Sequence, residues 1–187
     1  MKGSMVLCGV GGMGILKASE IIAEVILEKG LLVYQSEVHG MAQRGGSVVT
    51  HLRYGEEVYS PLLARGEADF MLAFEEMEAL RYLPYLKLGG TILLNTFCLR
   101  PPGTNATQYP QNIPALLEKA GFQVITVPAT EISLHLQDIR LTNVVLLGAF
   151  SKIFPVSEEE LWERAITRAF QGKNLEGNLR AFREGRR

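Results

Sequence analysis

The chain has 187 residues, of which 47% are hydrophobic and 21% charged, and its formal net charge is -1. This length predicts a single domain over residues 1–187 that buries a core without a disulfide or structural metal. The balance of 19 basic and 20 acidic residues argues against nucleic-acid binding. The sequence has no apolar run near the ~18 residues of a membrane span, so we expect no membrane association. Cys8 and Cys98 lie in apolar runs, which predicts buried free thiols and a reducing cytoplasm.

The first half of the chain alternates strand and helix patterns. Short apolar runs predict strands at 5–8, 31–35, 47–53 and 70–74, with Val58-Tyr59 as the hairpin partner of the third. Apolar residues at helical spacing predict a helix that begins at Ile15 and ends at Gly30. A second helix is predicted over 75–86, ended or kinked near Pro84 and closed by Gly89-Gly90.

The second half becomes mostly helical. The patterns predict strands at 91–95 and 122–127, helices at 113–120, 130–136 and 174–184, and an exposed proline-rich loop at 100–114. Thr142 to Phe154 is apolar nearly all round, which predicts a buried helix, and the next helix begins with a Ser157-x-x-Glu160 capping box. We therefore predict a three-layer α/β/α domain with a mixed, mainly parallel sheet and a helical C-terminal part. Helix 142–154 and the apolar stripe at 161–170 are also candidate interfaces, including one for a homodimer of the isolated chain.

A glycine-rich loop lies directly between the first predicted strand and helix. Gly9-Val10-Gly11-Gly12-Met13-Gly14 matches G-x-G-x-x-G, and its Gly9, Gly11, Gly12 and Gly14 are candidates for a cradle that binds a phosphate or carboxylate. An equal alternative is a tight turn that packs the helix on the sheet. Glu37 stands near the place of the acidic residue of a dinucleotide site, so a stand-alone Rossmann-like NAD(P)- or nucleotide-binding protein is a second functional hypothesis.

The segment from Ser36 to Ser47 is too polar for a core and too rich in glycine for a helix. We predict an active-site or partner-interface loop, and the alternative is a solvated loop. Arg44 would clamp a carboxylate or phosphate, and Glu37 and His39 would act as acid, base or orienting groups. The candidate residues of this loop are Glu37, His39, Gln43, Arg44, Gly45, Gly46 and Ser47. The sequence shows no complete catalytic set and no metal-ligand spacing, and His51 and His135 are expected to be structural histidines.

Together these motifs resemble the gamma subunit or domain of 2-oxoacid:ferredoxin oxidoreductases, the pyruvate/ketoisovalerate oxidoreductase gamma family. The resemblance rests on Gly9–Gly14, Ser36–Ser47, Glu78-Ala79-Leu80-Arg81-Tyr82-Leu83 and Gly89-Gly90. Within the family, the chain is most similar to the small (beta) subunits of the indolepyruvate branch. One departure is Met13, where similar proteins usually carry Gln, so a polar contact from that side chain is in question.

The resemblance implies a subunit of an enzyme that oxidatively decarboxylates a 2-oxoacid, with transfer to coenzyme A and electrons to ferredoxin. It also implies that a large partner subunit carries thiamine diphosphate, Mg²⁺ and the [4Fe–4S] clusters, while this chain alone binds no cofactor and is inactive. Its two cysteines are too few for a cluster, and it lacks a Gly-Asp-Gly…Asn-type diphosphate motif. A purely structural partner without ligand contact is a third hypothesis.

Overall fold

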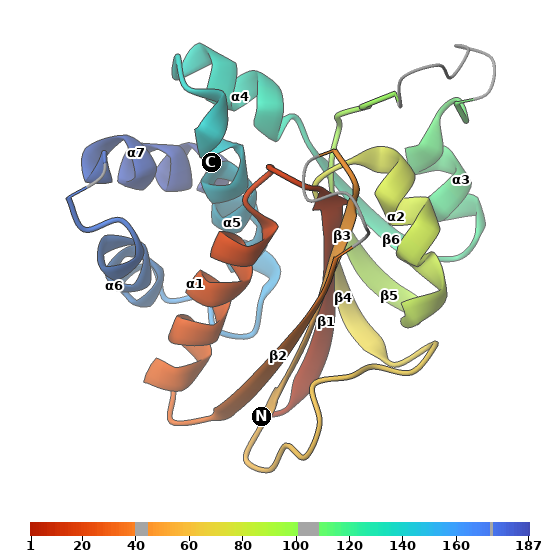
Figure 1. The fold of residues 1–187 in the computed structure, drawn as a ribbon, viewed down its shortest axis with the longest axis horizontal. Helices are drawn as coiled ribbons and strands as arrows, with labels where there is room; N and C mark the ends of the chain where they lie inside the picture. The colour runs from red at the N-terminus through yellow and green to blue at the C-terminus, as the bar shows by residue number, and fades with distance from the viewer. Residues whose placement is uncertain (40–44, 101–108, 173) are drawn as a thin grey trace.

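A six-stranded sheet forms the centre of the protein (Figure 1). The structure is a computed structural model that describes residues 1–39, 45–100, 109–172 and 174–187. The strands lie in the order β2-β3-β1-β4-β5-β6. Their bounds are β1 (Gly3–Val10), β2 (Leu32–His39), β3 (Ser47–Gly55), β4 (Ala68–Ala73), β5 (Leu86–Asn95) and β6 (Gln123–Val127).

Strand β1 lies at the junction of two kinds of pairing. It is antiparallel to β3, which is antiparallel to β2, whereas β1, β4, β5 and β6 pair in parallel. Three of the five strand pairs are thus parallel, and the prediction of a mixed, mainly parallel sheet is confirmed. The carboxyl ends of β1, β4, β5 and β6 therefore meet at one edge, where α/β sheets place their ligands.

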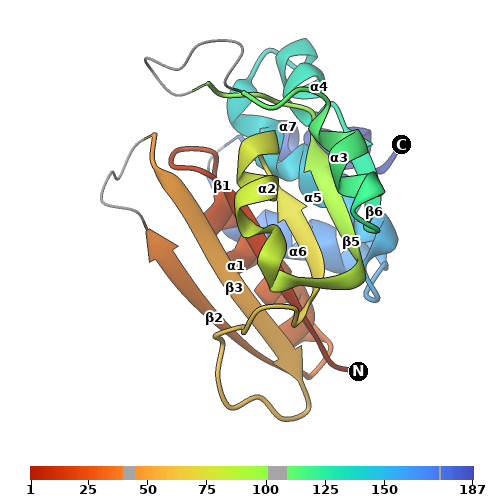
Figure 2. The same cartoon turned by 90° about the vertical axis from the view of Figure 1, so that its right-hand side faces the viewer.

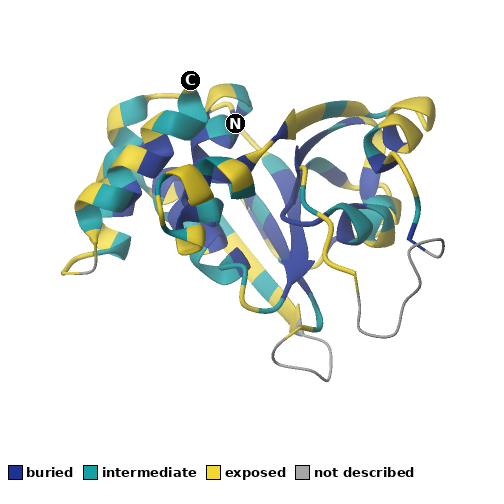
Figure 3. Cartoon of the chain, turned by 90° about the horizontal axis from the view of Figure 1, so that it is seen from above, coloured by how far each residue is buried: buried dark blue, intermediate teal, exposed yellow. Residues whose placement is uncertain are grey.

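Helices cover both faces of the sheet (Figures 1 and 3). The first face packs on α2 and α3, and the second on α1 and α5, with α6 and α7 stacked outside α1 and α5. This arrangement confirms the α/β/α layering and the helical C-terminal part. The α-helices are α1 (Ile15–Glu28), α2 (Glu76–Tyr82), α3 (Ile113–Lys119), α4 (Ala129–His135), α5 (Thr142–Ile153), α6 (Glu159–Ala169) and α7 (Leu175–Arg186). The short 3-10 helices among the described residues are η1 (Leu83–Tyr85) and η3 (Ile139–Leu141).

Helix α5 is buried between the sheet and α7, which explains why it is apolar nearly all round. The backbones of α5 and α7 approach closely, because a Cβ atom at Gly148 would lie 2.1 Å from the carbonyl oxygen of Phe182. Trp162 of α6 is fully buried and its indole N–H donates to the Val156 carbonyl oxygen over 2.8 Å. The apolar surface considered above as a candidate interface is thus largely buried in the chain's own core.

Several predicted helix ends differ from the structure. Helix α2 ends at Tyr82 and passes into η1, so Pro84 does mark the end of the helix. Gly89-Gly90 lies inside β5, and its prediction as a helix closure is wrong because the chain is already extended from Leu86. The predicted Ser157-x-x-Glu160 capping box is also wrong: Glu158 is the N-cap residue of α6, and its side chain makes no capping bond.

The hairpin of the sheet is formed by β2 and β3, and not by β3 and Val58-Tyr59 as predicted (Figure 2). Residues 58–59 belong to no strand, because β2 extends to His39 and occupies the free side of β3. Strand β2 is an edge strand, which explains how its Ser36-Glu37-Val38-His39 part is polar and still extended. The described part of segment 36–47 is therefore the end of β2, the base of the β2–β3 hairpin at Gly45-Gly46, and the first residue of β3.

The two cysteines have different environments. Both are free; Cys8 is buried, whereas Cys98 is exposed, so the prediction of a buried thiol is wrong at Cys98. Cys98 follows the last residue of β5 by three positions and has left the sheet. Among the helices that the structure describes, none is long and apolar enough to cross a membrane.

Candidate functional site

The two sequence motifs lie side by side at the carboxyl end of β1. Val10 is paired with Ser47 in the register of β1 and β3. Beyond this pair, the Gly11 amide donates to the Gly46 carbonyl oxygen over 2.8 Å, and the Gly45 amide donates to the Gly11 carbonyl oxygen over 3.4 Å. The glycine loop and the base of the β2–β3 hairpin tip thus form one surface.

Helix α1 begins at this surface with its N-terminus uncapped by any side chain. Gly14 is the N-cap residue with φ 76°, a left-handed conformation that favours glycine. The first turn of α1, which the structure describes in full, contains no acidic residue, and it carries Lys17. The helix dipole and the Lys17 ammonium therefore both favour an anion here. Lys17 also forms an ion pair with Glu20, which weakens its share of that field.

A cavity of about 450 Å³ opens beside the glycine loop. Phe74 of the β4–α2 connection and Asn95, the last residue of β5, contribute to its floor at the carboxyl ends of the strands. Lys17 and Arg140 are the basic residues among its described lining. Most of the remaining wall is apolar, so the cavity suits a ligand that combines a flat apolar group with an anion. The apolar lining comprises Met13, Phe74, Phe97, Leu99, Ile139 and Phe170.

Two buried amides fix the shape of this cavity. The Asn95 side chain donates to the Phe74 carbonyl oxygen over 3.0 Å and to the Thr130 hydroxyl over 2.9 Å. The Asn143 side chain donates to the Gly14 carbonyl oxygen over 3.3 Å and accepts from the Val144 amide over 2.9 Å. Asn143 therefore joins the start of α5 to the glycine loop. Neither residue was predicted from the sequence, although a single amide in the apolar run 142–154 could have indicated a polar contact of that helix.

Two carboxylates are buried at the start of α2. Glu75 is 1% exposed and Glu78 is 5% exposed. Glu75 accepts from the Glu78 and Leu99 amides and from the Tyr109 hydroxyl, over 3.0, 2.9 and 2.5 Å. Burial and the hydrogen bond to Glu75 raise the pKa of Tyr109 above its ordinary value. Burial, with the charges of Glu78 and Glu75, also raises the pKa of the Cys8 thiol, which makes Cys8 unreactive.

The structure brings together some of the predicted site residues. Gly11, Gly12, Gly14, Gly45, Gly46 and Ser47 lie at or beside the glycine loop, and Gly9 is the penultimate residue of β1. A Cβ at Gly9 would lie 2.8 Å from the Phe74 Cβ, so this glycine permits close packing. Glu37 lies on β2 and is not among the described residues that line the cavity, and His39 ends β2. Gln43 and Arg44 lie outside the described residues.

Met13 and the histidines have structural contacts. The Met13 sulfur accepts from the Val10 amide over 3.5 Å, so this side chain does make a weak polar contact. His51 is 5% exposed, its Nδ1 accepts from the Leu63 amide over 3.2 Å, and burial lowers its pKa. His135 contacts the Glu131 carbonyl oxygen of its own helix over 2.9 Å. Both histidines thus have the structural contacts expected of them.

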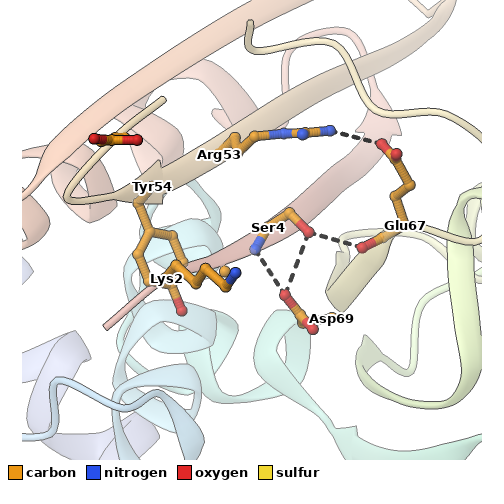
Figure 4. A pocket seen from close by; sticks show the side chains of 8 residues that line it. Lys2, Ser4, Arg53, Tyr54, Glu67 and Asp69 are labelled. Atoms are coloured by element: carbon orange, nitrogen blue, oxygen red, sulfur yellow. Dashed lines mark hydrogen bonds and ion pairs between the residues drawn. The ribbon is translucent and has the colours of Figure 1, made fainter. Parts of the chain in front are cut away.

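A second cavity of about 450 Å³ lies at the opposite end of the sheet (Figure 4). Three of its charged lining residues form ion pairs: Arg53 with Glu67, and Asp69 with Lys87, which lies outside the lining. Asp69 also accepts from the Ser4 amide over 2.8 Å. This cavity lies away from the carboxyl ends of the parallel strands, so we do not place the function there.

A family model described as pyruvate ferredoxin/flavodoxin oxidoreductase matches residues 4–187. The chain belongs to this family. It is 38% identical to indolepyruvate oxidoreductase subunit IorB of Thermococcus kodakarensis, over 97% of this chain and 93% of that protein. It is 40% identical to the subunit of the same name from Archaeoglobus fulgidus, over 99% and 94%. It is 27% identical to the common gamma subunit of the pyruvate/ketoisovalerate oxidoreductases of Pyrococcus furiosus, over 94% and 91%.

Solved structures of the family share the fold. The gamma subunit of a keto/oxoacid ferredoxin oxidoreductase from Geobacter sulfurreducens superposes with a TM-score of 0.73 at 23% identity, over 98% of this chain and 95% of that chain. A 2-oxoglutarate:ferredoxin oxidoreductase from Magnetococcus marinus, with 2-oxoglutarate, coenzyme A and succinyl-CoA bound, gives 0.76 at 25% identity. This chain is covered over 99% of its length and matches 30% of that longer chain. The prediction of a 2-oxoacid:ferredoxin oxidoreductase subunit is confirmed, and the stand-alone nucleotide-binding alternative finds no support.

The described side chains offer no ready metal site. Within residues 1–39, 45–100, 109–172 and 174–187, no three His, Cys, Asp or Glu side chains gather as metal ligands. The whole sequence has only two cysteines, and [4Fe–4S] clusters need four thiolates. The donor set of this chain therefore does not fit an iron–sulfur cluster.

Proposed function

We propose that residues 1–187 work as one gamma-type domain in an oxidoreductase complex that decarboxylates an aryl or branched 2-oxoacid, with indolepyruvate as the first candidate. The support for the substrate class is the gradient of similarity. Relatives named as indolepyruvate oxidoreductase subunits are 36–40% identical to this chain, whereas the pyruvate/ketoisovalerate gamma subunits are 25–27% identical. Coenzyme A is the proposed acceptor of the acyl group and ferredoxin of the electrons.

In this proposal the large partner subunit supplies thiamine diphosphate, Mg²⁺ and the [4Fe–4S] clusters. The support from this chain is its donor set, which has too few thiols for a cluster. Free thiols at Cys8 and at the exposed Cys98 support a reducing cytoplasm as the compartment. The isolated chain is proposed to be inactive, and self-association into a homodimer remains a proposal for the subunit without its partner.

The contribution of this chain is an anion site at the glycine loop. The observation that carries this proposal is the pair of hydrogen bonds that join Gly11 to Gly45 and Gly46, beside the uncapped start of α1 and the 450 Å³ cavity. The Gly11 amide is already bonded to Gly46, so the uncapped amides at the start of α1, together with Lys17, would bind a carboxylate or phosphate. The apolar wall would bind the flat part of the same ligand. Glu37, His39, Gln43 and Arg44 of the segment 36–47 are proposed, from the sequence alone, as further residues of this site.

The test is co-expression of the chain with a large thiamine and iron–sulfur subunit of an indolepyruvate-type complex, followed by assays with a viologen acceptor. Aryl, branched and short-chain 2-oxoacids are compared, with coenzyme A present or omitted. We expect the highest kcat/KM with an aryl 2-oxoacid and dependence on both subunits. Equal activity of the large subunit alone, or no turnover of any 2-oxoacid, would reject the proposed function.

Arg44 provides a sharper test of the anion site, although it lies outside the described residues. A desolvated guanidinium that binds a carboxylate or phosphate through two parallel hydrogen bonds makes a large contribution to binding. Arg44→Ala should therefore lower kcat/KM of the complex at least ~10-fold, and Arg44→Lys should restore only part of it, because lysine keeps the charge and loses the planar fork. A change within about twofold in both variants would favour the solvated-loop alternative for segment 36–47.

A further inference from the structure

Side chains of α2 hold the base of the hairpin tip from behind. The Ser47 hydroxyl donates to a carboxylate oxygen of Glu78 and lies 2.9 Å from the hydroxyl of Tyr82. The other carboxylate oxygen of Glu78 accepts from the Arg81 guanidinium over 3.0 Å. Glu78 and Tyr82 are four residues apart and therefore lie on one face of α2, toward β3.

These contacts are directly connected to the candidate site. Ser47 is the first residue of β3 and follows Gly46, whose carbonyl oxygen accepts from the Gly11 amide. The hydroxyl that Glu78 holds and the carbonyl group that binds the glycine loop thus belong to adjacent residues. Any shift of Ser47 relative to α2 must move Gly46 relative to the glycine loop as well.

The fold alone gives no reason for this polar cluster. Burying a carboxylate that is 5% exposed is unfavourable, and well-packed apolar residues of similar volume are often as stable or more stable in such places. The cluster fixes the position of β3 relative to α2. An apolar contact would allow the two elements to slide past each other, whereas the directional hydrogen bond between Ser47 and Glu78 does not. The string Glu78–Leu83 was part of the family resemblance, but the sequence assigned no role to it. The contacts with Ser47 supply a structural role for two of its residues, Glu78 and Tyr82.

We propose that Glu78, assisted by Tyr82, is a positioning residue that sets where Gly45-Gly46 lies against the glycine loop in the assembled enzyme. The inference rests on the proposed function of that loop. Glu78 contacts no reacting group; it acts through Ser47. Its effect should appear in ligand binding and in the local opening of the Gly11–Gly46 hydrogen bond, and not in the assembly of the subunits.

The test compares three variants in the complete complex. Glu78→Leu keeps the volume and removes the acceptor, Glu78→Gln keeps an oxygen that accepts from Ser47, and Thr50→Val is the matched control. Thr50 lies on the same strand, and its buried hydroxyl has no hydrogen-bond partner within the described part of the chain. We expect Glu78→Leu to raise the KM for the 2-oxoacid or for coenzyme A at least ~10-fold, Glu78→Gln to restore most of this loss, and Thr50→Val to leave both KM values within twofold.

A second measurement does not depend on turnover. Amide hydrogen exchange of Gly11, followed on the isolated chain, reports the opening of the Gly11–Gly46 bond. Glu78→Leu should speed it at least ~10-fold while the amides of β5 exchange as in the wild type, which separates a positioning role from general destabilisation. Unchanged Gly11 exchange in Glu78→Leu would overturn the inference, whatever the activity. If the wild-type complex is inactive but Gly11 exchanges faster in the Glu78→Leu chain, the proposed function is rejected and the positioning role is kept.

Discussion

Adding one methyl group at Gly148 tests the packing that holds α7 against α5. The new Cβ would lie 2.1 Å from the Phe182 carbonyl oxygen and 3.0 Å from the Arg186 amide nitrogen and the Gly185 Cα. All three atoms are backbone, so relief requires the two helices to separate by about 1 Å. A gap of that size forfeits roughly a quarter to a half of each facing van der Waals contact.

The expected magnitude follows from two opposing effects. Gly→Ala in a helix interior gains about 1 kcal/mol of helix propensity. Overpacking of a buried contact costs about 1–3 kcal/mol and occasionally more, and here the clash is with backbone that cannot rotate away. We expect the free energy of unfolding to fall by about 1–2 kcal/mol in Gly148→Ala, which lowers the melting temperature by roughly 2–8 °C for a chain of this size.

The assay is urea unfolding of the isolated chain, checked by thermal unfolding. Gly177→Ala is the control, because it lies in α7 and its Cβ would meet only the Asn174 side chain, which can turn away. This control should be neutral or slightly stabilised. If Gly148→Ala is as stable as Gly177→Ala, the close approach of α5 and α7 described above is incorrect.

Three further predictions concern the site and its surroundings. Gly14→Ala should lose at least about 1 kcal/mol more stability than Gly30→Ala. The φ angles at these two ends of α1 are alike, 76° and 74°, but only the Cβ at Gly14 would meet the Asn143 amide, at 2.6 Å. Equal losses measured by urea unfolding would contradict the contact between Asn143 and Gly14. Burial lowers the pKa of His51 below its ordinary value of 6.5, so the unfolded state binds more protons as the pH falls below 6.5, and the free energy of unfolding should decrease there. His51→Asn, which keeps an acceptor near the Leu63 amide, should flatten this pH dependence, and an unchanged slope between pH 6.5 and 5 would count against it. In thiol titration, one cysteine should react in the native protein and a second only after denaturation, in accord with the exposed Cys98 and the buried Cys8; two fast native thiols would disprove the burial of Cys8.

The sequence predicted the elements whose patterns are local. The period of apolar residues located α1 and α5 closely, and the nearly all-apolar run at 142–154 indicated a helix that is mostly buried, as α5 is. The pairing of strands was less accessible. A turn sequence precedes Val58-Tyr59, which suggested a hairpin with β3, but the strand that pairs with β3 there is β2. Which strands pair depends on the whole sheet and not on the adjacent residues.

For the site, sequence reasoning found the two loops and missed what lies between them. The G-x-G-x-x-G pattern and the segment 36–47 were visible, yet nothing in the sequence showed that Gly11 binds Gly46. Asn95 and Asn143 were missed because each is a single polar residue at the end of an apolar element. The structural role of each depends on which backbone groups the fold brings within hydrogen-bond distance. Glu78 could be read as part of a family string, but its contact with Ser47, 31 residues away, is a property of the folded chain.

The position of β2 at the end of the sheet has a consequence for handling the chain by itself. An edge strand presents backbone donors and acceptors that another strand can pair with, and natural proteins protect such edges with charges, prolines or a covering element. Leu32, Tyr34 and Val38 of β2 are about half exposed on one side of this eight-residue strand. Overproduction without a partner subunit therefore favours aggregation through strand addition at this edge, and low protein concentration with early mixing of the subunits is the physical remedy.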